Sequence, residues 1–199
     1  MTPREVRVVP HDPDWKEASE AEAAVLHSVL ADEALAIHHI GSTSVPGLSA
    51  KPIIDVLIEV QEMEKIDAFN EPMAAKGYEA RGENGIPGRR FFTKKRGRVF
   101  HIHIFETGTP EAERHLAFRD YLREHPETSA AYARLKVELA EKHPTDIESY
   151  MDGKDPFIKR VEKEALNWIR TRNTRSEMPK ADRLKARAEG PKRADRLTG

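Results

Sequence analysis

One pattern in this chain of 199 residues is best suited to carry chemistry. It combines a loop of small residues, a carboxylate and a pair of histidines. A loop of small residues begins at Gly41 and Ser42, and the apolar segment 53–60 that follows carries Asp55. Glycine lets a backbone approach a phosphate closely, and amides and serine hydroxyls donate hydrogen bonds to it. A carboxylate on the adjoining strand can hold Mg²⁺, which bridges to phosphates. An unpaired acid is costly to bury, so the pattern favours phosphate chemistry over a tight turn beside a buried acid.

Two histidines lie further along the chain, at His101 and His103, each followed by an isoleucine. On a strand both imidazoles point to one face. Together with Asp55 they predict a two-histidine, one-carboxylate metal site, which suits Zn²⁺, Mn²⁺ or Fe²⁺ better than Mg²⁺. Three alternatives stay open: phosphate binding, acid–base catalysis, or a polar pair on a solvated hairpin.

Basic and imidazole side chains near this pattern are further candidates. Lys51 precedes the segment 53–60 and can reach a phosphate or extend into solvent. Arg90 lies on the predicted hairpin, where its guanidinium suits bidentate phosphate contact or simply forms part of a solvated basic edge. Adjacent strand residues face opposite sides, so at most one of His38 and His39 can point to the site. We expect His39, which is nearer the loop, with a purely structural histidine as the alternative.

The elements that must position these residues follow from the spacing of apolar residues. After a short β-branched run at 5–9, we expect a helix at 13–35, strands at 36–40 and 53–60, and a helix at 62–76. A strand at 78–81 and a hairpin of 89–94 with 99–106 come next, and helices at 110–124, 127–142, 146–151 and 155–171 follow. This order predicts an α+β fold, with a small mixed β-sheet, flanking helices and a C-terminal helical part.

Composition narrows the class of protein. The chain has no cysteine, which excludes disulfides and thiolate metal sites, and no apolar run approaches the length of a membrane-spanning helix. No signal-peptide pattern precedes residue 10, so we expect a cytoplasmic protein.

Residues 1–172 form the expected domain. Residues 173–199 lack an apolar face and form an expected mobile, basic tail, for which solvation is favoured over nucleic-acid binding because it has no aromatic residue. The oligomeric state is left open.

The chain resembles the GrpB family, a group within the nucleotidyltransferase-fold superfamily. The resemblance is carried by HIGSTSVPGL at 39–48, AKPIID at 50–55 and HIHI at 101–104. Further matches lie at 118–123, 132–136, Tyr150, Lys154 and 157–158, so that it spans about residues 6–169. It implies a sheet of nucleotidyltransferase type and transfer of a nucleotidyl group from a nucleoside triphosphate to an unknown acceptor. The implied cofactor is a divalent metal, Mg²⁺ or Mn²⁺, with Zn²⁺ as a further option.

The resemblance also assigns residues. It implies a metal on Asp55 and places the cations Lys136 and Lys154 of the helical part on the substrate side. His101 and His103 are expected at the catalytic site with Asp55 because of their strand spacing, not because of the resemblance. The candidate phosphate-binding residues are Gly41, Ser42, Thr43, Ser44, Lys51, Arg90, Lys136 and Lys154.

The chain departs from the superfamily pattern at one position. The superfamily has a second carboxylate two residues after the first, where this chain has Leu57. Glu59 shares the face of Asp55 but lies about 13 Å away along a strand, too far to share one ion. The alternatives are therefore a non-catalytic nucleotide-binding module, a hydrolase built on the two histidines, or a folding-accessory domain. The last resembles the domain fused to some bacterial dephospho-CoA kinases, although this chain contains no P-loop.

Overall fold

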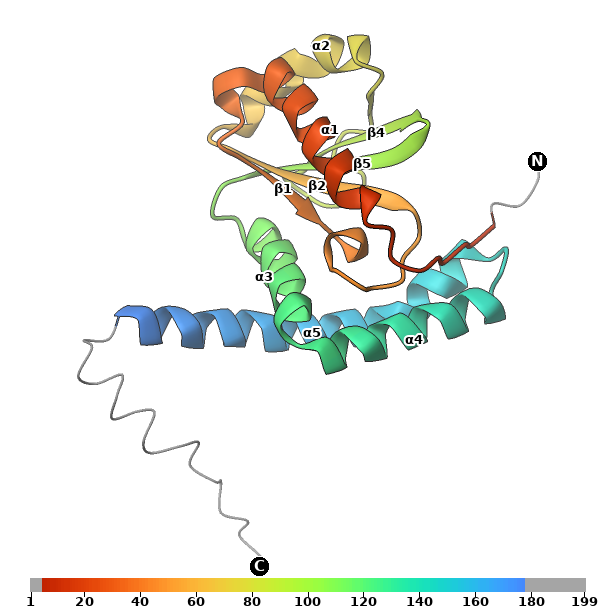
Figure 1. Ribbon diagram of the computed structural model, residues 1–199. Helices are drawn as coiled ribbons and strands as arrows, with labels where there is room; N and C mark the ends of the chain where they lie inside the picture. Colours follow the sequence, from red (N-terminus) through yellow and green to blue (C-terminus); the bar gives the residue numbers. More distant parts are fainter. Residues whose placement is uncertain (1–4, 178–199) are drawn as a thin grey trace, which may run out of the picture.

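A five-stranded sheet forms the centre of the computed structural model, which describes residues 5–177 (Figure 1). Its strands are β1 (Ala36–Ile40), β2 (Ile53–Val60), β3 (Glu79–Ala80), β4 (Arg90–Arg96) and β5 (Arg98–Glu106). They lie in the order β1-β2-β5-β4-β3. β2 pairs with β5 in parallel and the other neighbours pair antiparallel, so the predicted mixed sheet and α+β class are confirmed.

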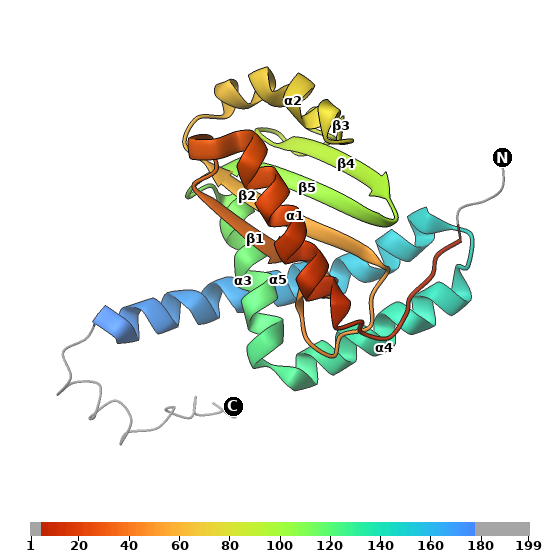
Figure 2. The same cartoon turned by 45° about the horizontal axis from the view of Figure 1, so that its top comes forward.

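Side-chain alternation divides the sheet into two faces. One face carries Val56 and Ile58 of β2 and Ile102 and Ile104 of β5, which pack in the main core under α1 (Asp14–Leu30). The short helix α2 (Asn70–Ala75) covers the same face (Figure 2). The opposite face carries Asp55, Leu57 and the two histidines, and packs against α3 (Pro110–Glu124). Asp55, His101 and His103 therefore share the face that α1 leaves uncovered.

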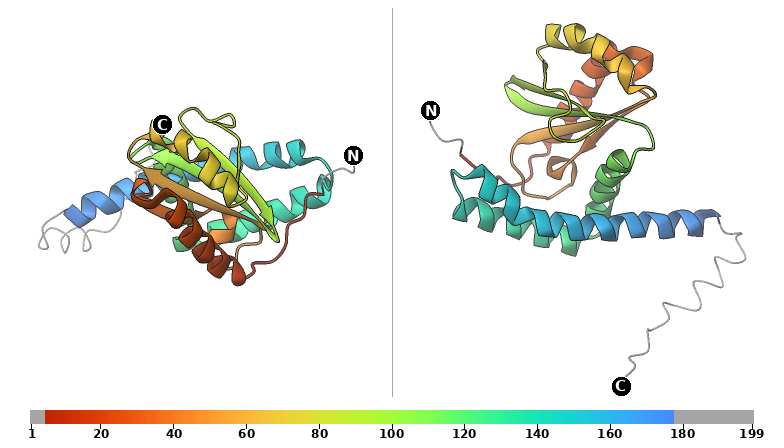
Figure 3. Two further views of the ribbon diagram at one scale, coloured as in Figure 1. Left: turned by 90° about the horizontal axis from the view of Figure 1, so that it is seen from above. Right: turned by 180° about the vertical axis from the view of Figure 1, so that it is seen from behind.

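The helical part lies beneath this second face. α4 (Pro126–Lys142) and α5 (Ile147–Glu177) run side by side, and α3 joins them to the sheet (Figure 3). A separate apolar cluster ties them to the loop after β1, because Val45 and Leu48 pack with Leu122 of α3, Tyr132 of α4 and Val161 of α5. The loop is therefore held between the sheet and the helices. No helix in the described part of the chain is long and apolar enough to span a bilayer.

Several predicted elements have different bounds. The first helix ends at Leu30 and continues only as a 3₁₀ turn, Ala31–Glu33, because Ala31 takes a positive φ of 48°. Most of the segment 62–76 is also 3₁₀, over Met63–Phe69. The run at 5–9 forms a single bridge, from Val9 to Ala50, rather than a strand.

The two short C-terminal helices predicted at 146–151 and 155–171 are one helix, α5. Gly153 does not end it but gives a close contact, since a Cβ there would lie 2.5 Å from Leu139 Cδ2 of α4. Pro156 lies inside the same helix. The helix passes the expected boundary at 172, and residues 178–199 of the expected tail lie outside the described residues.

Candidate functional site

A cavity of about 390 Å³ lies between the second face of the sheet and the helices α4 and α5. We call it the Asp55 cavity. Most of the predicted site residues line it, although they come from the loop, two strands and two helices. These are Gly41, Ser42, Thr43, Lys51, Asp55, His101, His103, Lys136 and Lys154.

Asp55 meets both histidines at the edge of this cavity. The register places Asp55 of β2 beside His101 of β5. Oδ1 of Asp55 lies 3.5 Å from Nδ1 of His101 and 3.4 Å from Nε2 of His103. On its other side His103 meets Arg89, whose Nη1 lies 3.3 Å from Nδ1. A guanidinium only donates, so Nδ1 of His103 accepts and Nε2 carries the proton that it donates to Asp55.

These contacts keep Asp55 ionised. Burial alone would raise its pKa, but hydrogen bonds from His101 and His103 outweigh burial and hold the pKa well below its usual range. Its second oxygen, Oδ2, faces the backbone of Gly41, where an added Cβ would lie only 2.6 Å away. Gly41 also has φ 70° and ψ −174°, a conformation open essentially to glycine alone. Glycine is therefore required at position 41 for two reasons: the backbone conformation there, and the close approach of the Asp55 carboxylate.

The zinc-type site predicted from Asp55, His101 and His103 does not fit this arrangement. Within residues 5–177, no three His, Asp or Glu side chains are placed to hold one ion. His103 also carries its proton on the nitrogen that would bind the metal, because Arg89 occupies the other nitrogen. Glu59 is engaged elsewhere, since it binds His38 Nε2 at 2.9 Å and Thr107 Oγ1 at 2.9 Å. Glu162 also lines the cavity, but its carboxylate binds Arg114, so Asp55 is the carboxylate best placed to hold a cation.

Lysines form the opposite wall of the cavity. Lys136 is 2% exposed; its ammonium donates to the Ser49 carbonyl and lies 4.4 Å from the centre of the Tyr132 ring. Lys154 lies 4.7 Å and Lys51 5.4 Å from the centre of the Tyr150 ring.

Burial makes these ammonium groups less basic. It lowers the pKa of Lys136 to about 7, with a contribution from the charge of Lys154. Burial and the charge of Lys51 lower the pKa of Lys154 to about 8. The cavity therefore gathers cations that repel one another and have lost much of their hydration.

Comparison with known proteins places this arrangement in a family. The model of the family described as GrpB protein matches residues 5–164. This chain belongs to the GrpB family. The crystal structure of GrpB from Enterococcus faecalis has a TM-score of 0.79 and 47% identity, and the match covers 82% of this chain and 99% of that one.

Two longer relatives contain a matching part. The UPF0157 protein YqkA of Bacillus subtilis is 48% identical over 171 residues, which are 85% of this chain and 50% of YqkA. The dephospho-CoA kinase of Mycolicibacterium paratuberculosis is 28% identical over 189 residues, which cover 82% of this chain and 46% of the kinase. This GrpB-family chain thus spans about half the length of both relatives.

Three of the predicted positions lie elsewhere in this GrpB protein. Arg90 faces the α1 side of the sheet and binds Asp67 through Nε at 2.6 Å and Nη2 at 2.8 Å, because it stands opposite Ile104 in the register. Ser44 turns away from the Asp55 cavity, and its hydroxyl donates to the Gly41 carbonyl. His39 points to the opposite face from Asp55. Thr43 lines the cavity, but its hydroxyl is engaged by the Ile53 carbonyl and by His39.

Sequence reasoning missed two side chains that shape the GrpB site. His115 of α3 lies 5.5 Å from the His103 ring, and its Nε2 is buried without a hydrogen-bond partner among the described residues. Burial and the neighbouring His103 lower its pKa to about 3. Arg89 is 5% exposed and positions His103. No local pattern marks either residue, since both reach the site through the packing of α3 and the turn before β4.

Proposed function

We propose that this protein binds the phosphate groups of a nucleotide in the Asp55 cavity. One observation carries the proposal: Lys51, Lys136 and Lys154 come from three separate segments and converge on a cavity that also holds the loop at Gly41 and Ser42. An anion of several charges offsets the mutual repulsion of these cations. Backbone approach at the glycine and a serine hydroxyl complete a phosphate-binding set.

The tyrosines support a phosphate ester over a simple ion. Tyr132 and Tyr150 place aromatic faces beside the ammonium groups and add apolar wall to the cavity. A cavity of about 390 Å³ lies within the range of small-molecule sites, where a few polar groups orient an otherwise apolar ligand. Lys51 and the loop 41–43 reach the phosphates, while the rings leave room for the rest of the ligand.

A divalent cation belongs to this proposal through Asp55 alone. Mg²⁺ is commonly held by one or two carboxylates together with substrate phosphates, and Mn²⁺ accepts the same oxygen ligands. When bound, such an ion supplies charge neutralisation at the phosphates. Asp55 suits this role because it is ionised and because Oδ2 faces the phosphate loop. His101 and His103 then orient the carboxylate rather than bind the metal.

Nucleotidyl transfer is the second candidate function. The observation that favours it is the placement of the carboxylate strand directly beside the Gly41–Ser42 loop. An acceptor hydroxyl would attack the α-phosphorus and lose its proton to water. A new P–O bond would form as the bond between the α-phosphorus and the bridging oxygen breaks, and pyrophosphate would leave with that electron pair. Leu57 is fully buried against Ile40 and Phe105, so the second carboxylate of such enzymes is replaced here by core packing. Binding without turnover therefore takes precedence over transfer.

The first test is thermal unfolding with each nucleoside triphosphate, with and without Mg²⁺ or Mn²⁺. A ligand at 100 times its dissociation constant stabilises by about 2.7 kcal/mol, which raises Tm by several degrees. The variant Asp55→Asn removes the negative charge of the carboxylate, so it distinguishes metal-dependent binding from binding of the free triphosphate. With Mg²⁺ we expect this variant to bind more weakly than the wild type. Without metal we expect it to bind more tightly, because a repelling carboxylate has been removed.

The outcomes separate the candidates. Stabilisation without release of pyrophosphate supports a binding module, and pyrophosphate release that Asp55→Asn abolishes supports transfer. No stabilisation by any millimolar triphosphate overturns the proposal and directs attention to the alternative of a folding-accessory domain. The same response to metal in both proteins would overturn the role of Asp55.

A further inference from the structure

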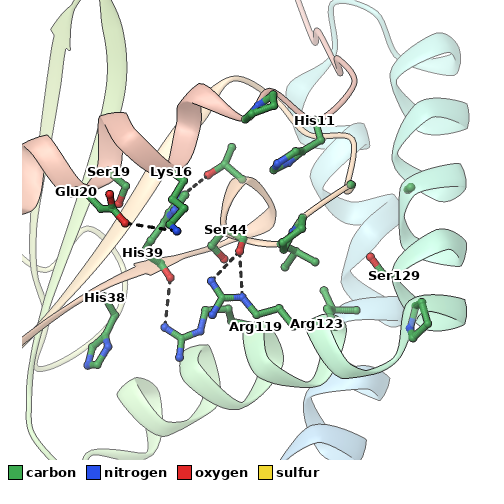
Figure 4. Close-up of a pocket in the computed structure, with 18 of the residues that line it drawn as sticks. His11, Lys16, Ser19, Glu20, His38, His39, Ser44, Arg119, Arg123 and Ser129 are labelled. Carbon is green, nitrogen blue, oxygen red and sulfur yellow. Dashed lines mark hydrogen bonds and ion pairs between the residues drawn. The ribbon is translucent and has the colours of Figure 1, made fainter.

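A second cavity lies on the other side of the loop that forms the phosphate site. Its volume is about 970 Å³, and it is bounded by α1, β1, the loop 43–47, α3 and the start of α4. Figure 4 shows Arg119 and Arg123 reaching from α3 toward β1 and the loop, with His11 and Lys16 on the opposite wall. We call it the Arg119 cavity. It shares only Thr43 with the Asp55 cavity.

The two arginines are held in place by acceptors of the backbone. Arg123 donates from Nε at 3.0 Å and from Nη2 at 2.7 Å to the Ser44 carbonyl. Arg119 donates from Nη1 to the His39 carbonyl at 3.3 Å and from Nε to the Asp120 side chain at 2.7 Å. These contacts fix both guanidinium planes at the wall of the cavity. Each guanidinium has five N–H groups, so those not used in these contacts can donate to the oxygens of a phosphate or carboxylate.

The charge balance of this cavity differs from that of the Asp55 cavity. Asp120 contacts both arginines and offsets one of their two charges, while Lys16 pairs with Glu20 at 3.8 Å. Desolvation and the charge of Arg119 lower the pKa of Arg123, and desolvation lowers that of His39 to about 4, so this histidine is neutral at pH 7. About one net positive charge faces the cavity. That suits a monoester phosphate better than a triphosphate.

Two further features indicate a ligand of mononucleotide size. The Nδ1 atom of His11 is buried and has no hydrogen-bond partner among the described residues, and such atoms in native structures are usually satisfied. Val45, Pro46 and Ala133 supply apolar wall beside the arginines. A volume near 1,000 Å³ is far larger than a single phosphate needs. We propose that the Arg119 cavity is a second binding site, specific for a phosphomonoester of about mononucleotide size.

Calorimetric titration with AMP tests this proposal on the full chain. Lys136→Met disables the Asp55 cavity and leaves the Arg119 cavity intact. Ala130→Phe places a ring in the Arg119 cavity from an exposed position of α4. Ala24→Phe is the matched control, because Ala24 is an exposed helical alanine of α1 outside the cavity lining. His11→Phe keeps an aromatic ring beside Trp15 and removes only the ring nitrogens.

We expect AMP to bind the wild type, Lys136→Met and Ala24→Phe with the same dissociation constant. We expect at least tenfold weaker binding in Ala130→Phe, weaker binding in His11→Phe, and no binding of adenosine. Loss of AMP binding in Lys136→Met with full binding in Ala130→Phe would overturn the second site and place the nucleotide in the Asp55 cavity. Absence of AMP binding to the wild type at millimolar concentration would also overturn it, whatever triphosphates do.

Discussion

Lys136 shows how the Asp55 cavity changes the chemistry of one side chain. Its pKa of about 7 and that of Lys154, about 8, mean that both lose charge as pH rises through 7 to 9. We predict that triphosphate affinity falls over pH 7.5 to 9, by up to about tenfold per pH unit for each lysine that must be protonated. Titration calorimetry over this range measures it. A constant or rising affinity would show that these lysines do not bind the phosphates.

The same lysine makes stability depend on pH. Its pKa in the folded protein lies below the ordinary value of 10.5, so between about pH 7 and 10 the unfolded chain holds more protons. The free energy of unfolding must therefore rise with pH in this window, by at most about 1.4 kcal/mol per pH unit for one group. Urea unfolding should show a smaller slope in Lys136→Met. Lys142→Met, an exposed lysine of α4, should keep the wild-type slope.

Single residues were predictable where strand alternation decides their direction. Asp55, His101 and His103 share a face because the period of a strand is two, and adjacent strands placed them in contact. The prediction that Arg90 binds phosphate was wrong for the same reason. A shift of one residue along a strand moves a side chain to the opposite face of the sheet, and Arg90 lies on the α1 face. Only the register, Arg90 opposite Ile104, reveals that parity.

The loop that begins at Gly41 is the element on which the proposed phosphate site depends most. Gly41→Ala should destabilise the protein by about 1–3 kcal/mol through its backbone conformation, and the new Cβ should also displace Asp55. We therefore predict that Gly41→Ala loses the Mg²⁺-dependent part of triphosphate binding. Chemical unfolding and calorimetry on the same sample measure both effects.

Gly47→Ala is the matched control for that loop. Gly47 also has a positive φ, 76°, but an added Cβ meets nothing within 4 Å. It should share the backbone cost and keep triphosphate binding. If the two variants bind equally well, the close approach of Gly41 to Asp55 does not serve the site.

The elements themselves were predicted better than their ends. Strands 36–40 and 53–60 were placed correctly by their apolar runs and bounding loops. The break expected near Gly153 was wrong, because that glycine serves the contact with Leu139 of α4, and a long-range contact leaves no local signal. The 3₁₀ segment Met63–Phe69 was likewise predicted as part of a helix at 62–76. Its buried residues, Met63 and Ile66, are three apart, a spacing common to α- and 3₁₀-helices.

The whole molecule consists of a sheet and a helical part joined across two cavities. Lys136 of α4 and Lys154 of α5 line one cavity with Asp55 of β2 because α3 folds the helices back under the sheet (Figure 1). The resemblance to the family indicated these lysines, but only the packing shows that they meet. We predict that a triphosphate slows amide hydrogen exchange in 41–51 and 150–158 and leaves β3 unchanged. Protection confined to α1 would place the triphosphate in the other cavity.

The most direct measurement is the dissociation constant of the magnesium complex of the most stabilising triphosphate, determined by calorimetry for three proteins. These are the wild type, Lys136→Met and Lys142→Met. Both variants remove one lysine from α4: Lys136 lines the Asp55 cavity, and Lys142 is exposed outside it. The account predicts at least a tenfold loss of affinity for Lys136→Met and none for Lys142→Met. Equal dissociation constants for all three proteins would contradict it.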